Sequence, residues 1–218
     1  MPIILDLETA AIGDADQYIE PAEAPANYKD AAKIAEYVAS ATARAVDRCG
    51  LDPDLCRIVA LGWMFAQDKG PTVRVCKTDT EEKDTLDQFW RDFIAGGEPS
   101  LVTFNGLKFD IPVLLRRSLY LRVPHPAINL DRYRTPHIDL FNRLTFNGAI
   151  QGHSLKFYLS RFGIPNDDLT SGKDIAALVK AGAWDAVAAH CASDVVSTKQ
   201  LAERIGAIRL VPEATGAF

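Results

Sequence analysis

Three observations predict an α/β fold for this chain of 218 residues. Strand-like and helix-like stretches alternate along it, 48% of its residues are hydrophobic, and no repeat or low-complexity tract interrupts the pattern. A chain of this length and composition can bury a sizeable core as one unit. We therefore expect residues 1–218 to form a single α/β domain in which helices flank a central five-stranded sheet.

The first predicted strand, Ile3–Thr9, carries two acids at its end. It is a short apolar run after Pro2, which is typical of a buried strand. Asp6 and Glu8 stand two residues apart, so they project from the same face of the strand, with Leu7 on the other. Two carboxylates this close repel each other, and burial increases the cost. The strand either ends in two solvated acids or supplies half of an acidic site.

The other elements follow from hydrophobic periodicity and turn signals. A loop over 10–27 and a helix over 28–49 form a helical insertion at about 10–54, before the second strand. Further strands are expected at 57–65, 72–76, 100–104 and 137–140. Further helices are expected at 80–95, 110–120, 154–162, 173–181 and 184–208. The tail from Pro212 is expected to fray.

Two more acids lie where a ligand site is expected. Asp110 begins a helix just beyond the fourth strand, at the edge where open α/β sheets collect ligands. His190 and Asp194 are one turn apart on the last helix, among small residues that permit close approach. Both observations also have an interpretation without a ligand site. Asp110 could be an acid that the helix dipole stabilises, and His190 could be a histidine on the surface or in the core.

The charge distribution points to an anionic partner despite a net charge of −5. Residues 107–161 contain nine lysines and arginines but only three acids, a local excess that is typical of a nucleic-acid groove. The alternative is a solvated surface of mixed charge. No apolar stretch is long enough to span a membrane, and the N-terminus lacks the basic and apolar regions of a signal peptide. The four cysteines have no metal-binding spacing and are expected to be reduced, so the sequence predicts a cytoplasmic protein with no membrane partner.

Three motifs in order resemble those of the DEDD superfamily of 3'-5' exonucleases, the DnaQ-like branch of the ribonuclease-H-like fold. They are Leu5–Thr9 with its two acids, Phe104–Asp110, and His190–Asp194. The resemblance covers nearly the whole chain and implies a mixed sheet. With His137–Leu140 and the stretch 171–194 included, the chain is similar to stand-alone exonucleases akin to the proofreading domain of family B polymerases.

The third motif departs from the family pattern. One branch of the superfamily has a tyrosine four residues before the last aspartate, and the other has a histidine five residues before it. Here His190 stands four residues before Asp194. One position on a helix turns a side chain by about 100°. His190 therefore need not stand where the base of either branch stands. We still expect it to assist catalysis, with the alternatives that it positions water or phosphate or takes no part.

The resemblance implies a two-metal mechanism. Carboxylates are the ligands that Mg²⁺ or Mn²⁺ prefers, and two divalent cations would hold the scissile phosphate. Asp6 would bridge both ions, Glu8 and Asp194 would complete the shell of the first, and Asp110 would hold the second. His190 could take the proton of the attacking water near neutral pH.

The same resemblance implies how a nucleic acid with a free 3' end would bind. Leu7 and Thr9 would frame the last nucleotide, and Phe109 would stack on a base or wedge beside it. Asn105 is a candidate for the substrate backbone, and Lys156, Arg116 and Arg117 are candidates for phosphate contacts. The structural alternatives are core packing for Leu7 and Phe109 and a turn cap for Asn105.

The expected function is a metal-dependent 3'-5' exonuclease on single-stranded DNA or unpaired 3' ends, releasing nucleoside 5'-monophosphates. The alternatives are an exoribonuclease or oligoribonuclease, a non-catalytic nucleic-acid-binding module on the same fold, and, last, a glycosidase with two carboxylates. A homodimer, and a polymerase acting in trans, are compatible partners.

Overall fold

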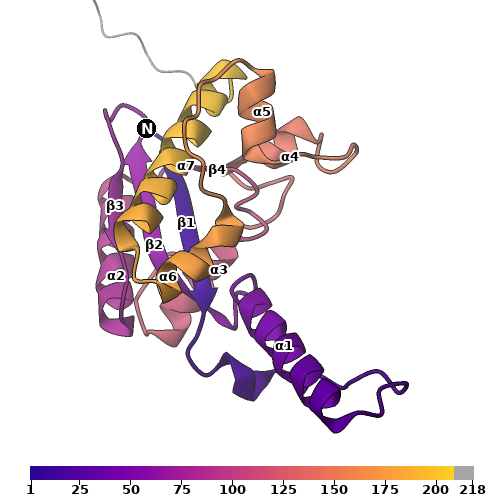
Figure 1. Cartoon of the computed structure of the whole chain (residues 1–218). Helices are drawn as coiled ribbons and strands as arrows, with labels where there is room; N and C mark the ends of the chain where they lie inside the picture. The colour runs from indigo at the N-terminus through magenta and orange to yellow at the C-terminus, as the bar shows by residue number, and fades with distance from the viewer. Residues whose placement is uncertain (209–218) are drawn as a thin grey trace, which may run out of the picture.

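The computed structural model describes residues 1–208, and its centre is a five-stranded sheet in the order β3-β2-β1-β4-β5 (Figure 1). The strands are β1 (Ile3–Ala11), β2 (Cys56–Phe65), β3 (Thr72–Val75), β4 (Leu101–Thr103) and β5 (Ile138–Asp139). β1 pairs antiparallel with β2 and parallel with β4. β2 and β3 are antiparallel, whereas β4 and β5 are parallel. The predicted mixed sheet is therefore confirmed.

The helices are α1 (Ala31–Cys49), α2 (Asp79–Ala95), α3 (Asp110–Tyr120), α4 (Leu140–Leu144), α5 (Leu155–Arg161), α6 (Ile175–Lys180) and α7 (Trp184–Arg204). The six helices predicted with ranges are present, α3 with the predicted ends and the others with shifted ends, and a short helix, α4, follows β5. Two 3₁₀ turns are added, η1 (Ala15–Tyr18) and η2 (Gly172–Asp174). The loop prediction for 10–27 was therefore wrong over η1 and over the end of β1. The prediction for the tail from Pro212 lies outside the described residues.

The side chains of β1 alternate between two helical layers. Leu5 and Leu7 pack in a core cluster with residues of α2 and α3, such as Phe89 and Leu114. Ile4, on the other face, packs in a cluster with residues of α4, α5 and α7. Because successive strand residues point to opposite faces, Asp6 and Glu8 belong to the α7 side. In Figure 1, α6 and α7 lie in front of the sheet.

A glycine on β2 lets α7 approach the sheet closely. Gly62 is the register partner of Asp6. A Cβ at this position would lie 2.9 Å from Cys191 Sγ and 2.9 Å from Val195 Cγ2, both on α7. Real Cβ atoms do not come so close to other heavy atoms, so any larger residue would push the helix or the strand aside. The close packing brings the middle of α7 over the acids of β1.

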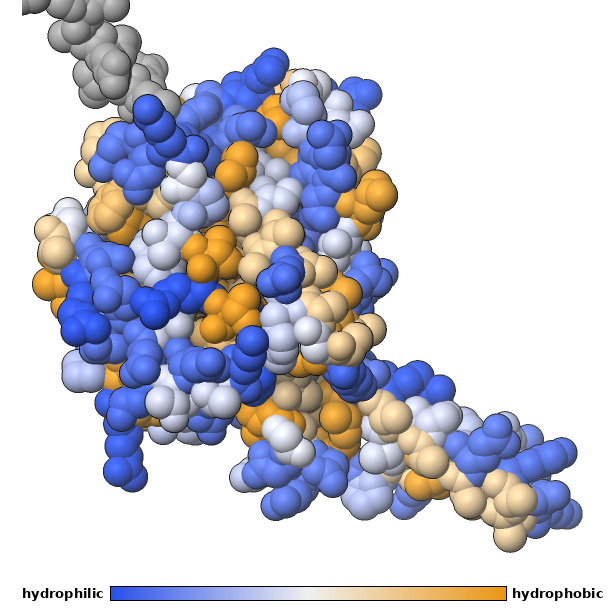
Figure 2. Space-filling model, turned by 60° about the vertical axis from the view of Figure 1, so that its left-hand side comes forward, coloured by the Kyte–Doolittle hydropathy of each residue, from blue (hydrophilic) through white to orange (hydrophobic). Residues whose placement is uncertain are grey.

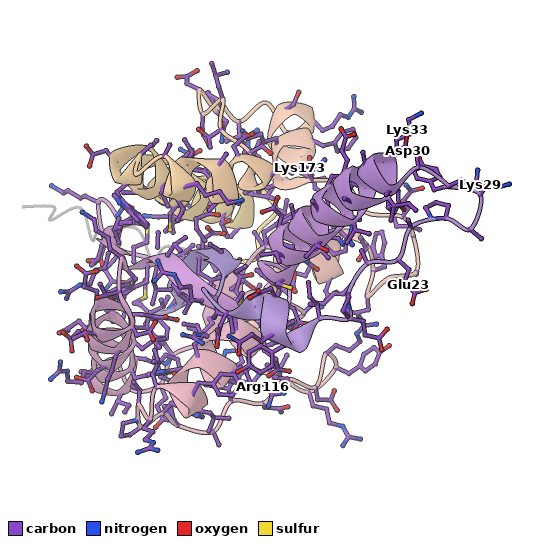
Figure 3. All side chains as sticks on the ribbon, turned by 60° about the horizontal axis from the view of Figure 1, so that its bottom comes forward. Glu23, Lys29, Asp30, Lys33, Arg116 and Lys173 are labelled. Atoms are coloured by element: carbon purple, nitrogen blue, oxygen red, sulfur yellow. The ribbon has the colours of Figure 1, made fainter. Side chains whose placement is uncertain are left out.

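The predicted insertion between β1 and β2 is an arm that leaves the body of the molecule. Figures 1 and 2 show α1 extending away from the sheet, and Figure 3 places Lys29, Asp30 and Lys33 at its far tip. The base of the arm is held by Thr9 Oγ1, which donates to the carbonyl of Gly50 at 2.5 Å. An ion pair of 2.8 Å between Lys180 and Asp47 joins α6 to α1. Across residues 1–208, every helix is too short or too polar to cross a membrane.

Candidate active site

A cleft of about 510 Å³ opens beside the middle of β1 and the end of β4. Its walls combine acidic, apolar and amide side chains from both halves of the chain. They are Asp6, Leu7, Glu8, Leu51, Pro53, Phe104, Asn105, Lys108, Phe109, Asp110, Gly172, His190 and Asp194. Eight of these thirteen residues are site residues predicted from the sequence. Leu51 and Pro53, which enter the cleft from the turn after α1, were not predicted.

Three elements bring the four predicted carboxylates together. Asp6 and Glu8 come from β1, and Asp194 comes from α7. Asp110 is the first residue of α3 and is buried. An acid in the first turn of a helix is favoured by the helix dipole, which helps to explain why this one tolerates burial. The strand, the helix start and the long helix therefore converge on one cleft.

The acids raise each other's pKa. For Asp6, burial raises the pKa well above its ordinary value, and the charges of Glu8, Asp110 and Asp194 raise it further. Burial and the neighbouring acids likewise raise the pKa of Glu8. Burial raises the pKa of Asp110 to about 7, although backbone N–H groups partly oppose the rise. Burial also raises the pKa of Asp194, against the lowering effect of His190. The cluster therefore holds more negative charge than the protein neutralises.

A fifth buried acid shapes the loop that delivers Asp110. Asp139, at the end of β5, accepts hydrogen bonds from the backbone N–H of Asn105 at 2.9 Å and of Leu107 at 3.1 Å. It also caps α4 through the N–H groups of Phe141 and Asn142. In this loop Asn105 has a φ of +65°, a conformation that asparagine adopts more readily than most residues with a side chain. The loop leads from β4 directly into α3.

His190 is buried and lies among the acids. Its Nε2 atom is 3.5 Å from Glu8 Oε1 and 3.9 Å from Asp194 Oδ2. Its Nδ1 atom is 2.5 Å from Asp168 Oδ2. The position four residues before Asp194 thus still places the imidazole inside the cleft.

Asp168 was not predicted as a site residue. It lies in the loop between α5 and η2, 22 residues before His190, and no motif or spacing distinguishes it from its neighbour Asp167. Burial opposes its ionisation, but hydrogen bonds from His190 and from the N–H of Thr170 lower its pKa below the ordinary value. Asp168 is therefore an ionised partner of the histidine.

Two residues predicted as substrate contacts, Lys156 and Thr9, do not line the cleft. The ammonium of Lys156 donates to the carbonyls of Asp168, at 2.8 Å, and of Thr170, and it lies 3.8 Å from Asp168 Oδ2. Thr9 donates to Gly50, at the base of the arm. Leu7, Asn105 and Phe109 do line the cleft, and Leu7 and Phe109 also contribute to the core.

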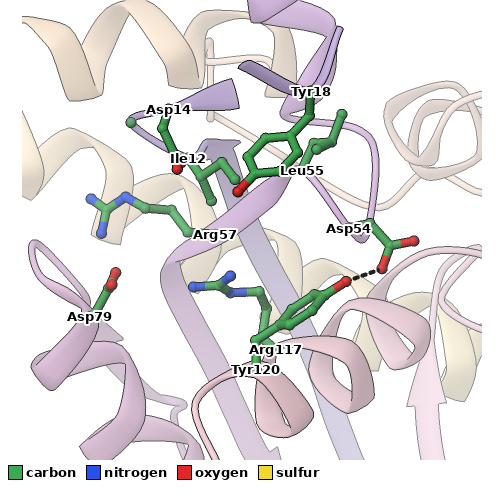
Figure 4. Close-up of a pocket in the computed structure, with 10 residues that line it drawn as sticks. Ile12, Asp14, Tyr18, Asp54, Leu55, Arg57, Asp79, Arg117 and Tyr120 are labelled. Atoms are coloured by element: carbon green, nitrogen blue, oxygen red, sulfur yellow. Dashed lines mark hydrogen bonds between the residues drawn. The ribbon is translucent and has the colours of Figure 1, made fainter. Parts of the chain in front are cut away.

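The two arginines considered for phosphate contacts are engaged within the protein. Arg117 is buried and forms a bidentate pair with Glu82 at 2.7 and 2.9 Å, so the expectation of a phosphate contact was wrong for it. It lies in a separate cavity of about 410 Å³, where Tyr120 donates to Asp54 (Figure 4). Arg116 forms an exposed ion pair with the same aspartate at 2.9 Å.

The donor set of the cleft fits a divalent cation. One ligand atom each from Glu8, His190 and Asp194 lies within 4.8 Å of the others. Asp194 Oδ1 is buried and has no hydrogen-bond partner among the described residues. A buried carboxylate oxygen without a partner is costly, and a cation would satisfy it. These residues can therefore hold a metal ion.

Comparisons with known proteins identify the class. The structure is similar to that of the family B DNA polymerase from the hyperthermophilic archaeon Pyrobaculum calidifontis, with a TM-score of 0.61 at 18% sequence identity. The similarity covers 94% of this chain and 24% of the polymerase, so the chain spans about a quarter of that protein's length. The fold is ribonuclease-H-like, as the sequence predicted.

A family model gives the particular assignment. The chain belongs to the family described as predicted 3'-5' exonucleases related to the exonuclease domain of PolB, which matches residues 51–209. The matched range includes Asp110, His190 and Asp194 but begins after the strand that carries Asp6 and Glu8. No protein with a curated description matches the sequence. The predicted resemblance to DEDD exonucleases is confirmed.

Proposed function

We propose that this protein is a 3'-5' exonuclease that hydrolyses single-stranded DNA or unpaired 3' ends to nucleoside 5'-monophosphates, using two divalent cations, Mg²⁺ or Mn²⁺. The observation that carries the proposal is the convergence of Asp6, Glu8, Asp110 and Asp194 in one cleft. Their mutual repulsion and the unpartnered oxygen of Asp194 are what a cation site requires.

The proposed roles follow from position. Asp6 lies among the other three acids and would bridge two cations, Glu8 and Asp194 would complete the first site, and Asp110 would hold the second. When bound, such cations lower the pKa of the attacking water and neutralise charge on the phosphate and the leaving 3' oxygen.

Substrate would be held by the remaining walls of the cleft. Lys108 carries the one lysine or arginine charge among the lining residues, and we assign it to a phosphate of the substrate. Leu7 and Phe109 offer apolar surface to the terminal base, and Asn105 offers an amide to the substrate backbone. Leu51 also lines the cleft and is 72% exposed, so it offers a further apolar surface to the substrate.

Labelled oligonucleotides test the proposal. Single-stranded DNA and RNA, labelled at the 5' end or the 3' end, are incubated with Mg²⁺ or Mn²⁺ and either the wild type or Asp6→Ala. A 5'-labelled DNA ladder that shortens stepwise, and that Asp6→Ala abolishes, is the expected result. Asp84→Asn, in an exposed position on α2, serves as a control for a lost carboxylate and should cleave like the wild type.

The other outcomes separate the alternatives. Faster shortening of RNA than of DNA would replace the DNA assignment with an exoribonuclease. Binding of oligonucleotides without cleavage under any metal would replace the enzyme with a binding module. Cleavage that persists in Asp6→Ala would refute the role of the carboxylate cluster.

A further inference from the structure

His190 presents one ring nitrogen to the acids and the other to Asp168. The imidazole is 3% exposed, so both contacts are made inside the protein. The carboxylate of Asp168 accepts a hydrogen bond from Nδ1–H at 2.5 Å. With the proton on Nδ1, the lone pair of the neutral ring is on Nε2, which faces Glu8 and Asp194.

Asp168 is itself held in place. Lys156 donates to its main-chain carbonyl at 2.8 Å and approaches its carboxylate at 3.8 Å. The N–H of Thr170 donates to Asp168 Oδ1 at 2.8 Å, and Asp168 N–H donates to Asn166. The loop therefore fixes the carboxylate, and the carboxylate fixes the orientation and the tautomer of the imidazole.

The distances from Nε2 to the two acids suit a shared ion better than hydrogen bonds. At 3.5 and 3.9 Å they exceed the range of a good N–H···O bond. Two ligand atoms that are each about 2.1 Å from one cation lie about 3.0 to 3.6 Å apart, depending on the angle between them. Small adjustments of side chains bring all three donors to one ion, and Asp194 Oδ1 is still free to bind as well.

We propose that His190 is a nitrogen ligand of a divalent transition-metal ion, completing a site with Glu8 and Asp194, and that Asp168 is the residue that positions it. A metal-binding histidine almost always donates its other N–H to a carboxylate, a backbone carbonyl or water, and His190 donates to a carboxylate. A mixed set of nitrogen and oxygen ligands favours Mn²⁺ and later transition ions over Mg²⁺, which prefers oxygen.

This role differs from that of a general base. A lone pair that binds a cation is not available to take the proton of a water. The inference rests on the metal dependence of the proposed function, but its test needs no substrate and no cleavage.

The test measures the metal directly in the whole protein. Mn²⁺ is added to the wild type and to three variants, and pulsed electron paramagnetic resonance detects coupling of the ion to a directly bound nitrogen. We expect this coupling in the wild type and in His153→Gln, a control at an exposed histidine, and its loss in His190→Gln. Asp168→Asn is expected to weaken Mn²⁺ binding about 10- to 100-fold, the usual effect of losing the carboxylate partner of a metal-binding histidine.

Titration with Mg²⁺ completes the design. Because Mg²⁺ gains less from nitrogen, the ratio of Mn²⁺ to Mg²⁺ affinity should fall in His190→Gln and stay unchanged in His153→Gln. Mn²⁺ that binds the wild type without nitrogen coupling would overturn this inference and leave the proposed exonuclease intact. Wild-type protein that binds no Mn²⁺ or Mg²⁺ would overturn both. Equal losses of Mn²⁺ and Mg²⁺ affinity in His190→Gln would show that His190 has a merely structural role, and would also overturn this inference.

Discussion

Replacing Asp110 by asparagine should stabilise the metal-free protein at neutral pH. Asp110 is buried at the first position of α3, and its pKa is raised to about 7 from an ordinary value of 3.8. Asparagine has nearly the same shape and keeps an oxygen that accepts backbone N–H groups. The substitution therefore removes the charge and little else.

The sign and size of the effect follow from linkage. Below pH 3.8 the carboxyl is protonated in both the folded and the unfolded chain, so it makes no difference to stability. Between pH 3.8 and about 7 only the unfolded chain ionises, and the free energy of unfolding falls as the pH rises. A difference of about three pH units corresponds to about 4 kcal/mol above pH 7, and we expect about 2–4 kcal/mol because the other acids respond to the lost charge.

Urea unfolding in the presence of a chelator measures the effect. Asp110→Asn should raise the midpoint at pH 8 and leave it nearly unchanged at pH 4, while Asp84→Asn should change it at neither pH. Adding Mn²⁺ should narrow the gap at pH 8, since a cation relieves the same repulsion in the wild type. If Asp110→Asn were destabilised equally at both pH values, the conclusion that the charge of Asp110 destabilises the folded protein would be refuted.

Two further substitutions probe how the fold supports the site. Arg117→Met should lower the free energy of unfolding by about 3–5 kcal/mol, because it leaves the fully buried carboxylate of Glu82 without its arginine partner. The double variant with Glu82→Gln should recover part of this loss in the same urea assay. No recovery would contradict this reasoning. Gly62→Ala should cost about 1–3 kcal/mol through overpacking against α7 and should also weaken Mn²⁺ binding. Gly70→Ala, which meets no atom within 4 Å, is its control, and equal metal affinity in both variants would contradict the argument.

The sequence predicted the parts of the site that depend on local rules. The two-residue period of a strand placed Asp6 and Glu8 on one face, and the strand-to-helix junction placed Asp110 at the sheet edge. The four-residue spacing of His190 and Asp194 likewise put both on one face of α7. These rules operate over a few residues and need no tertiary information.

Contacts between distant segments were not predictable in this way. Asp168 reaches His190 from a loop, and Glu82 reaches Arg117 from another helix, so neither pairing leaves a spacing in the sequence. For the same reason, the local excess of cations did not show that Arg117 and Lys156 are bound within the protein, whereas Lys108 lines the cleft. The position of His190 depends on how closely α7 approaches β2. That approach is visible in the structure, where a Cβ on Gly62 would lie 2.9 Å from Cys191 Sγ, and no sequence motif predicts it.

The two faces of the sheet differ in function: one face contributes most to stability, and the other holds the candidate metal ligands. The largest fully buried side chains, Trp90, Phe89 and Phe93, come from α2, and the Glu82–Arg117 pair joins that helix to α3. On the other face, α7 brings His190 and Asp194 over β1, where repulsion between acids opposes folding. Substitutions on the α2 face should therefore lower stability without altering the preference between Mn²⁺ and Mg²⁺. Substitutions of the acids should do the reverse, because they relieve repulsion while they remove ligands.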